Sequence, residues 1–189
     1  MNLAPIEPVS LMDVKAILET CGDDFTGYRD RAVILCLLDT GARAREFIAL
    51  TLEDIDHISG AVIIRKGKGG KFRMVFIGKK TRKALRAYLK RRSDETRSLW
   101  VSIHGEPLAV GSLQAILERR AKTAGITVPS PHDFRRAFAV NMLRAGVDIY
   151  NLQKLMGHSD LSTLLRYLAL VTDDSKTAHD KGSPVDRVI

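Results

Sequence analysis

The spacing of apolar residues along the chain predicts a mainly helical protein. Apolar positions recur every three or four residues over most of the sequence, which is the period of an amphipathic helix. Ser10 is suited to begin the first helix, Gly22 and Gly27 to bracket a loop, and Gly41 and Gly125 to end later helices. From these signals we expect helices at residues 11–19, 28–39, 43–50, 79–92, 113–124, 132–145, 149–156 and 161–168.

The central part of the chain changes to a pattern that is typical of strands. Residues 61–64 and 72–77 are β-branched or aromatic, and Gly67-Lys68-Gly69-Gly70 between them predicts a hairpin with a glycine-rich turn. Residues 99–103 predict a third short strand. The chain shows no internal repeat and no interdomain linker. We therefore expect one domain over residues 1–189, mainly α with a small three-stranded antiparallel sheet, an α+β fold.

The composition fits a globular protein with an excess of positive charge. The chain has 189 residues, of which 45% are hydrophobic, so a disordered or fibrous protein is excluded. Thirty Lys and Arg against twenty-two Asp and Glu give a net charge of +8. Such an excess suits a polyanionic partner, because basic side chains that neutralise phosphates release counterions. On charge alone, a basic protein without such a partner is equally consistent.

Cysteine usage and hydropathy narrow the cellular setting. Cys21 and Cys36 are the two cysteines, and neither belongs to a zinc-binding pattern or a disulfide framework. The first residues do not form a signal peptide, and no apolar run approaches the ~20 residues that a membrane span requires. We expect a cytoplasmic protein that binds no metal and does not contact a membrane.

Four short stretches stand out for their combination of residue types. They are Thr40-Gly41-Ala42-Arg43-Ala44-Arg45-Glu46, Gly67-Lys68-Gly69-Gly70-Lys71, His132-Asp133-Phe134-Arg135, and Leu155-Met156-Gly157-His158 followed by Tyr167. Taken alone, each has a structural explanation. Arg43 could pair with Glu46, His158 could cap a helix, and Tyr167 could be a core residue whose hydroxyl finds a partner. No single motif decides between structure and chemistry.

Together, the four stretches resemble the catalytic domain of the phage integrase and Xer-like tyrosine recombinases. The boxes of that family, TG-L-R-x-S-E-L, GKG-x-K-x-R, H-x-L-R and L-G-H with a downstream tyrosine, have counterparts here in the same order. The resemblance covers nearly the whole chain. Arg45 stands where a small polar residue is common and Arg136 where His is frequent, but neither change removes a catalytic group.

The resemblance implies a nucleophile and two groups that transfer protons. Tyr167 would attack the scissile DNA phosphate, giving a 3′-phosphotyrosine and a free 5′-hydroxyl. A tyrosine with a pKa of ~10 is mostly protonated at neutral pH, so the phenol needs a base, and His132 is the expected one. Lys68 would protonate the leaving 5′-oxygen as the general acid.

The resemblance also implies groups that stabilise the transition state. Arg43 and Arg135 would hold the non-bridging phosphate oxygens through their planar, forked donors. His158 would hydrogen-bond a phosphate oxygen, and Glu46 would support Arg43. Because two arginines and a lysine supply the positive charge, we expect no metal and no cofactor, and the absence of a P-loop excludes ATP.

Basic residues beside the motifs are expected to contact double-stranded DNA, namely Arg45, Lys66, Lys71, Arg73 and Arg136. The basic segment at residues 79–92 is a further candidate for backbone contacts, although a solvated amphipathic face explains it nearly as well. The family's usual N-terminal DNA-binding domain is expected to be absent, because the catalytic pattern begins near residue 10. We expect self-association into a tetramer on DNA, in which residues 173–189 either pack on a neighbouring subunit or fold back.

The expected function is therefore site-specific DNA recombination through a covalent phosphotyrosine. Integration of a mobile element is the preferred role, and resolution of chromosome dimers is the alternative. A type IB topoisomerase-like enzyme and a catalytically silent DNA-binding domain are the remaining candidates. A purely structural or interaction module would leave the four motifs unexplained.

Overall fold

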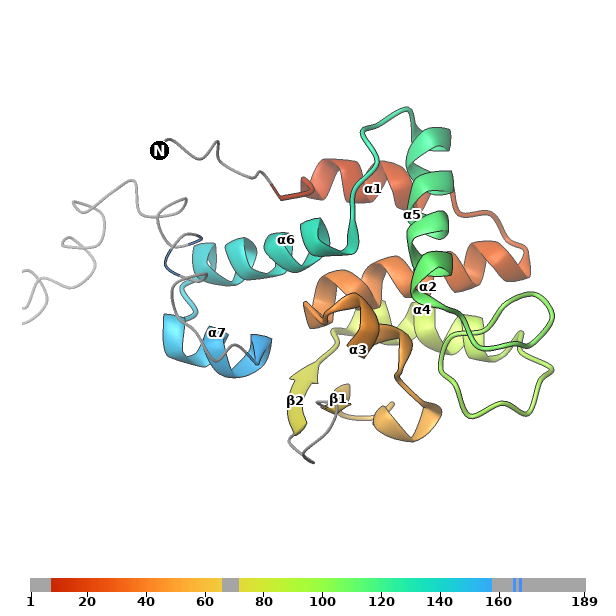
Figure 1. The fold of residues 1–189 in the computed structure, drawn as a ribbon, viewed down its shortest axis with the longest axis horizontal. Helices are drawn as coiled ribbons and strands as arrows, with labels where there is room; N and C mark the ends of the chain where they lie inside the picture. Colours follow the sequence, from red (N-terminus) through yellow and green to blue (C-terminus); the bar gives the residue numbers. More distant parts are fainter. Residues whose placement is uncertain (1–7, 66–71, 158–164, 166, 168–189) are drawn as a thin grey trace, which may run out of the picture.

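A computed structural model of the chain describes residues 8–65, 72–157, 165 and 167 and shows a group of helices with a small sheet at one edge (Figure 1). In chain order the elements are α1 (Leu11–Glu19), α2 (Phe25–Thr40), α3 (Ala44–Ile48), the 3-10 helix η1 (Leu52–Asp54), β1 (Ala61–Arg65), β2 (Phe72–Phe76), α4 (Lys79–Leu89), α5 (Val110–Ala124), α6 (Pro131–Arg144) and α7 (Ile149–Met156).

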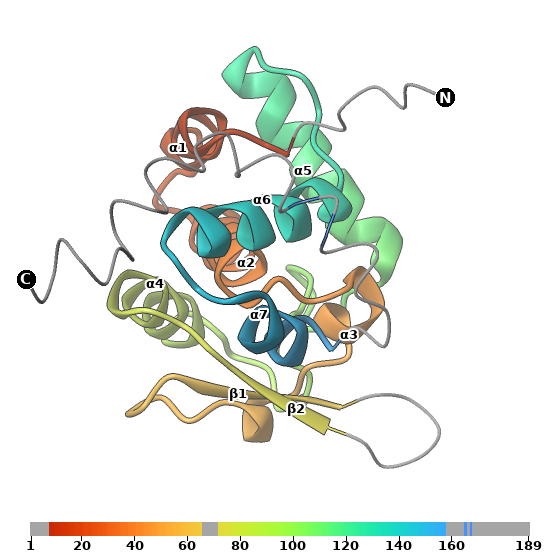
Figure 2. The ribbon, with the colours of Figure 1, turned by 90° about the vertical axis from the view of Figure 1, so that its left-hand side faces the viewer.

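Helix α2 lies at the centre of the molecule. Figure 2 views it nearly end-on, with α1, α4 and α6 around it, and contacts with all three are present. Its residues Ala32, Val33, Ile34, Cys36 and Leu37 are all buried, so several sides of the helix face other elements. A helix that is apolar on more than one side is stable only when it is covered on those sides. This burial makes α2 the support on which the other helices pack.

Helix α2 begins three residues earlier than the sequence indicated. Asp24 is its N-cap, and the Asp24 carboxylate accepts a hydrogen bond of 2.7 Å from the Gly27 backbone N–H. The expectation that Gly27 lies in a loop was therefore wrong. A Cβ at Gly27 would stand 2.1 Å from the Gly22 carbonyl oxygen, so this glycine permits a close approach of the chain inside the helix.

The expected third strand is not formed, and the sheet described by the structure has two strands, β1 and β2, paired antiparallel. Leu99, Trp100 and Val101 are all fully buried. Their backbone groups bond to separate partners: the Leu99 N–H donates to the Leu50 carbonyl (2.9 Å), and the Val101 N–H donates to the Tyr88 hydroxyl (3.1 Å). This segment crosses the core with scattered hydrogen bonds, so it does not form a ladder with the hairpin.

Strand β2 turns an arginine toward the core and its aromatic residues toward solvent. Arg73 and Val75 are buried, whereas Phe72, Met74 and Phe76 are exposed. In the ladder Arg73 pairs with the buried Ile64 of β1. Alternate residues of a strand point to opposite faces. The same orientation of β2 therefore buries Arg73 and exposes the two phenylalanines.

Some expectations fall on residues that the structure does not describe. The hairpin turn at 66–71 and the tail at 173–189 lie outside the described residues, and so does most of the helix expected at 161–168. Leu165 and Tyr167 are described, and both are helical. Among the described residues, no helix combines the length and the apolar character that crossing a membrane requires.

Candidate active site

Three arginines from separate elements meet beside one glutamate. Arg43 immediately precedes α3, Arg73 lies on β2 and Arg135 on α6, and Glu46 of α3 contacts the first two. Figure 2 shows how the elements allow this, with α7 between α6 and the hairpin and with α3 beside them. We call these four residues the Glu46 cluster.

The position of Arg43 follows from two helix ends that adjoin in the sequence. Gly41 ends α2 in the left-handed conformation, with a φ of 55°, as the sequence predicted. A Cβ at Gly41 would also lie 2.4 Å from the Phe138 ring. Arg43 is then the N-cap of α3, and its backbone N–H donates to Glu46 Oε2 at 3.0 Å. The turn therefore orients the Arg43 side chain by local capping.

Glu46 bridges Arg43 and Arg73. Its carboxylate accepts hydrogen bonds from Arg43 Nη1 (3.1 Å) and from Arg73 Nη1 (3.0 Å) and Nη2 (2.7 Å). Burial alone would raise the pKa of Glu46. Hydrogen bonds from Arg73 and from the Arg43 backbone, together with the charges of both guanidiniums, instead lower this pKa to about 2. Glu46 is therefore a carboxylate at every physiological pH, and it holds two arginines in fixed positions.

Arg73 does not lie where a DNA-contacting residue is expected. Its side chain is 7% exposed. Both of its terminal nitrogens bond to Glu46, and its Nε donates to the Leu155 carbonyl at 2.8 Å. A buried guanidinium that uses three of its five N–H donors inside the protein is poorly placed to form a fork to a DNA phosphate. Arg73 thus connects β2 and α3 to the last turn of α7.

Arg135 is buried without a carboxylate partner among the described residues. The residue is 5% exposed, and it donates to the carbonyls of Gly41 and Met156, the second at 2.7 Å. Burial and the charges of Arg43 and Arg73 lower the pKa of Arg135 to about 10, although Glu46 and Tyr167 act in the opposite direction. A buried cation whose hydrogen-bond partners are neutral carbonyls is costly, so this arrangement favours binding of an anion here.

The start of α6 places His132 one turn before Arg135. Ser130 and Asp133 form a capping box in which the Asp133 carboxylate accepts from the Ser130 N–H (2.7 Å) and hydroxyl (2.6 Å). His132 is exposed in this first turn. Asp133 also accepts from the Arg136 guanidinium, so Arg136 is partly engaged within the protein. Sequence reasoning gave Asp133 no role, although a serine three residues before an acid is a recognisable capping signal.

Tyr167 lies on the same side of the molecule as the Glu46 cluster. Its half-buried ring packs against a small hydrophobic cluster on α6 and α7 that contains Phe138 and Met156. Its phenol is close enough to Arg135 to influence the pKa of that residue. Four other expected site residues lie outside the described residues, namely Lys66, Lys68, Lys71 and His158.

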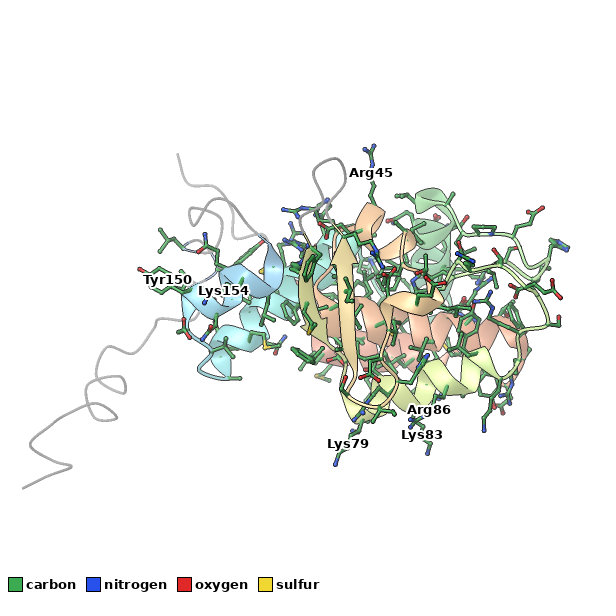
Figure 3. All side chains as sticks on the ribbon, turned by 90° about the horizontal axis from the view of Figure 1, so that it is seen from below. Arg45, Lys79, Lys83, Arg86, Tyr150 and Lys154 are labelled. Carbon is green, nitrogen blue, oxygen red and sulfur yellow. The ribbon has the colours of Figure 1, made fainter. Side chains whose placement is uncertain are left out.

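Two sets of exposed basic residues point to different sides of the molecule. Arg45 projects from α3 toward one side, and Lys79, Lys83 and Arg86 project from α4 toward the other (Figure 3). Arg45 belongs to α3, the helix that also carries Glu46.

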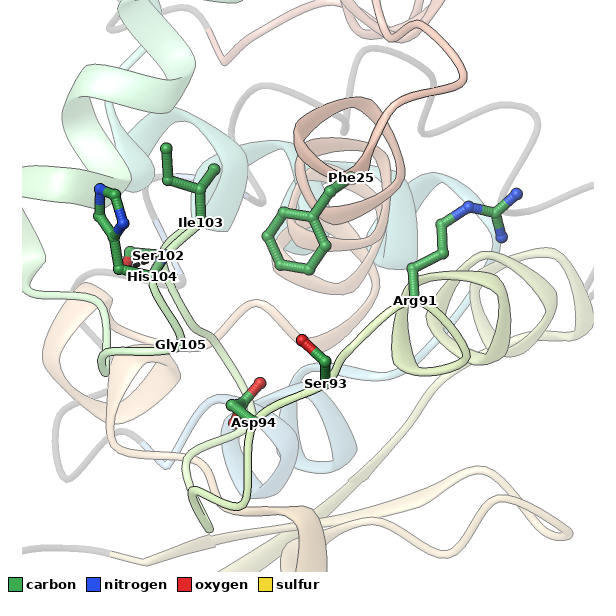
Figure 4. A pocket seen from close by; sticks show the side chains of 8 residues that line it. All are labelled: Phe25, Arg91, Ser93, Asp94, Ser102, Ile103, His104 and Gly105. Atoms are coloured by element: carbon green, nitrogen blue, oxygen red, sulfur yellow. Dashed lines mark hydrogen bonds between the residues drawn. The ribbon is translucent and has the colours of Figure 1, made fainter.

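The described part of the chain contains no group of three His, Cys, Asp or Glu residues that could hold a metal ion. An open pocket is present at the other end of α2, where Phe25, Ser93, Ser102 and His104 line it together with neighbouring residues (Figure 4). None of the expected site residues lies in this pocket. The Glu46 cluster is therefore the candidate active site.

The fold and the motifs identify the class of protein. Residues 9–173 match the model of the Phage integrase family, and the chain belongs to that family. The chain is 35% identical over 167 residues to Tyrosine recombinase XerA of Thermococcus kodakarensis, covering 87% of this chain and 59% of that protein. It therefore spans about three fifths of the length of this curated relative. The resemblance seen in the sequence motifs is confirmed.

Solved structures confirm a mainly helical fold with a small antiparallel sheet. The crystal structure of XerA recombinase aligns with a TM-score of 0.80 and 27% identity, over 97% of this chain and 67% of that chain. The XerH site-specific recombinase bound to palindromic difH substrate, in a post-cleavage complex, has the same fold. Its TM-score is 0.75 at 22% identity, over 97% of this chain and 54% of that chain.

Proposed function

We propose that the protein is a site-specific DNA recombinase that cleaves and rejoins strands through a covalent 3′-phosphotyrosine on Tyr167. The observation that carries this proposal is Arg135, a buried guanidinium whose described partners are two neutral carbonyls. The Glu46 cluster has three guanidiniums and one carboxylate, which bonds to Arg43 and Arg73 but not to Arg135, so a site for an anion remains. Membership of the phage integrase family and the DNA-bound XerH structure support DNA phosphate as that anion.

Arg43 and Arg135 form the phosphate-binding part of the site in this proposal. The Arg43 side chain is 41% exposed and uses one terminal nitrogen on Glu46, so its outer donors can reach a phosphate. Both guanidiniums would bind the non-bridging oxygens, and they would bind them most strongly when negative charge accumulates in the transition state. Because the donors are held in place before DNA arrives, little reorganisation accompanies the reaction.

The covalent step exchanges one phosphate ester for another. The Tyr167 oxygen forms a bond to phosphorus while the bond from phosphorus to the 5′-oxygen breaks. His132 takes the phenol proton, and Lys68 gives a proton to the departing 5′-oxygen. His158 adds a hydrogen bond to a phosphate oxygen. Reversal of the same step by another 5′-hydroxyl rejoins the strand, so no external energy source is needed.

We propose that Arg73 is a positioning residue. Its guanidinium links β2 to Glu46 of α3 and to the last turn of α7. In the sequence, Lys68 lies shortly before β2, and His158 lies shortly after α7. The remaining basic residues, Lys66, Lys71 and especially the exposed Arg45, would contact the DNA backbone. Arg136 would do so only in part, because Asp133 already holds its guanidinium.

The biological role of the recombinase is a proposal separate from its chemistry. We propose integration of a mobile element, with self-association into a tetramer on DNA. Resolution of chromosome dimers is the alternative. Phage or transposon genes beside this gene would support the first role. Their absence, together with a single chromosomal recombination site, would support the second.

Covalent capture tests the proposed chemistry. The wild-type protein is incubated with labelled fragments of host genomic DNA, and complexes that survive detergent are recovered and sequenced. The captured site is then built into a nicked suicide substrate. We expect an adduct that resists a 3′→5′ exonuclease but not a 5′→3′ exonuclease, because the protein blocks the 3′ end. The matched control is Tyr167→Phe, which removes one oxygen.

The outcomes separate the candidate functions. No adduct with the wild-type protein, or the same adduct with Tyr167→Phe, would overturn the proposal. Retention of DNA without any adduct indicates a silent DNA-binding domain. Adducts at many unrelated sequences, with relaxation of supercoiled DNA, indicate a topoisomerase-like enzyme.

A further inference from the structure

The outer face of α4 is a row of exposed positive side chains. Helix α4 turns Thr81, Ala84, Leu85 and Tyr88 toward the core. The opposite side carries five exposed cations, Lys79, Lys80, Lys83, Arg86 and Lys90. Among the described residues, none of the five has an ion pair or a side-chain hydrogen bond to another protein group. We call these five residues the α4 basic face.

This row of charge is unfavourable for the helix that carries it. Lys79 and Lys80 occupy the first turn of α4, where the positive end of the helix dipole disfavours cations. The helices α1, α3 and α6 instead carry an acid in their first turn, namely Asp13, Glu46 and Asp133. Like charges three or four residues apart on α4 repel each other as well. Local rules that are broken without compensation inside the protein indicate a partner outside it.

The α4 basic face and Arg45, the exposed residue of α3 that is proposed to contact the first DNA segment, point to different sides of the molecule. Strand β2 begins at the hairpin turn and ends just before α4, so its five residues separate the turn from α4. Figure 3 shows Lys79, Lys83 and Arg86 pointing away from the side to which Arg45 points. A straight duplex that contacts Arg45 therefore lies on a different side of the molecule from the α4 basic face.

We propose that the α4 basic face binds the phosphate backbone of a second DNA segment, distinct from the one held at the Glu46 cluster. A protein partner is disfavoured, because interface centres are depleted in lysine and enriched in aromatic residues, whereas this face presents lysines and one arginine. Lysines supply point charges without a fixed fork, which suits binding to backbone phosphates in any sequence. This inference rests on the proposed function in one respect, because the proposed function identifies the bound polyanion as DNA.

The test compares two variants with the same loss of charge. One is Lys79→Gln/Lys83→Gln/Arg86→Gln on the α4 basic face. The control is Lys15→Gln/Arg97→Gln/Lys154→Gln, three exposed cations on other elements. Each protein is saturated with an immobilised duplex that carries the captured recombination site, and a fluorescent random-sequence duplex is then added. We expect the wild-type protein and the control to retain the second duplex. The α4 variant should retain at least about tenfold less of it.

The salt dependence of second-duplex binding gives an independent readout. Each lost phosphate contact should lower the slope of log K against log[salt] by about 0.9, so the α4 variant should lose up to about 2.7. Circular dichroism and thermal unfolding establish that both variants are folded. Covalent adduct formation on the immobilised site should be equal in the α4 variant and the wild-type protein.

Three outcomes would overturn this inference. Equal losses in both triple variants would mean that net charge alone is responsible. A loss of first-duplex binding or adduct formation in the folded α4 variant would mean that α4 contacts the same segment. If poly-glutamate binds the wild-type protein and is displaced by acidic polypeptides but not by DNA, the partner of the α4 basic face is an acidic protein. If the protein forms no adduct, the proposed function is overturned. The second-duplex test is then carried out with an immobilised duplex of random sequence, so the two failures remain distinguishable.

Discussion

Two clusters in this protein have the same composition but different bonding. The Glu46 cluster holds one carboxylate with Arg43, Arg73 and Arg135. A second cluster, which we call the Asp30 cluster, holds the fully buried Asp30 with three arginines from α2 and α5, Arg29, Arg119 and Arg120. Each cluster has three guanidiniums for one acid.

The clusters differ in how the guanidiniums are used. In the Asp30 cluster all three arginines bond to the acid: Arg29 Nε at 2.9 Å, Arg119 Nη2 at 2.6 Å and Arg120 Nε at 2.8 Å. In the Glu46 cluster Arg135 bonds to two backbone carbonyls instead. A cluster in which each arginine contacts the carboxylate is complete as a structural element. A cluster that leaves a buried arginine without one is suited to bind an anion.

The largest expected effect is structural and falls on the Asp30 cluster. Asp30→Asn removes the charge that holds Arg29 and Arg120, which are nearly buried, so the folded state should lose about 3–5 kcal/mol. Urea unfolding monitored by circular dichroism measures this loss. A variant of unchanged stability would mean that the cluster does not hold α2 to α5.

The next effect is catalytic and falls on the Glu46 cluster. Arg135→Gln should reduce the rate of adduct formation by about 10²–10³, because one preorganised donor to the transition state is lost. Arg135→Lys keeps the charge without the fork and should recover only part of the rate. Single-turnover adduct formation on the suicide substrate provides the measurement. An unchanged rate in Arg135→Gln would remove the distinction between the two clusters.

The third effect is a pH dependence of stability that originates at Glu46. Its pKa is about 2 in the folded protein against 4.5 for an ordinary glutamate, so folding favours the charged form. The resulting stabilisation, on the order of 3 kcal/mol, is fully present above pH 4.5 and is lost as the pH falls toward 2. The difference in unfolding free energy between wild type and Glu46→Gln should therefore shrink over that range. A difference that stays constant with pH would contradict the assigned pKa.

The smallest effect is expected at the exposed member of the Asp30 cluster. The Arg119 side chain is 51% exposed, and Asp30 keeps two buried arginines without it, so Arg119→Gln should cost about 1 kcal/mol or less. Adduct formation should not change.

Arg43 is the exposed member of the Glu46 cluster, with a side chain that is 41% exposed. Arg43→Gln should lower stability by a similarly small amount but should reduce the rate of adduct formation. Equal adduct rates in the two variants would contradict the comparison.

Much of the helical framework could be predicted from the sequence, because helix ends carry local signals. Ser10, Gly41 and Gly125 lie at the expected ends of helices. The predicted bounds at residues 11–19 and 149–156 agree with α1 and α7. One error arose where distant contacts decided the outcome, because burial of Trp100 and its neighbours against the core replaced the expected third strand. The other error concerned a local signal, because Asp24 caps α2 three residues before its expected start at residue 28.

The sequence by itself determined the family of this protein, since the motifs that mark Arg43, His132, Arg135 and Tyr167 are short, ordered and local. The sequence allowed the pairing of Arg43 with Glu46, three residues apart, but only the tertiary structure decided that Arg73 and the two α5 arginines of the Asp30 cluster face a carboxylate. A strand alternates its faces at every residue, so the inward position of Arg73 depends on what covers the hairpin. Asp30 meets its partners on α5 about ninety residues away, as separations of 89 and 90 show. Such pairings depend on helix packing, which no local pattern contains.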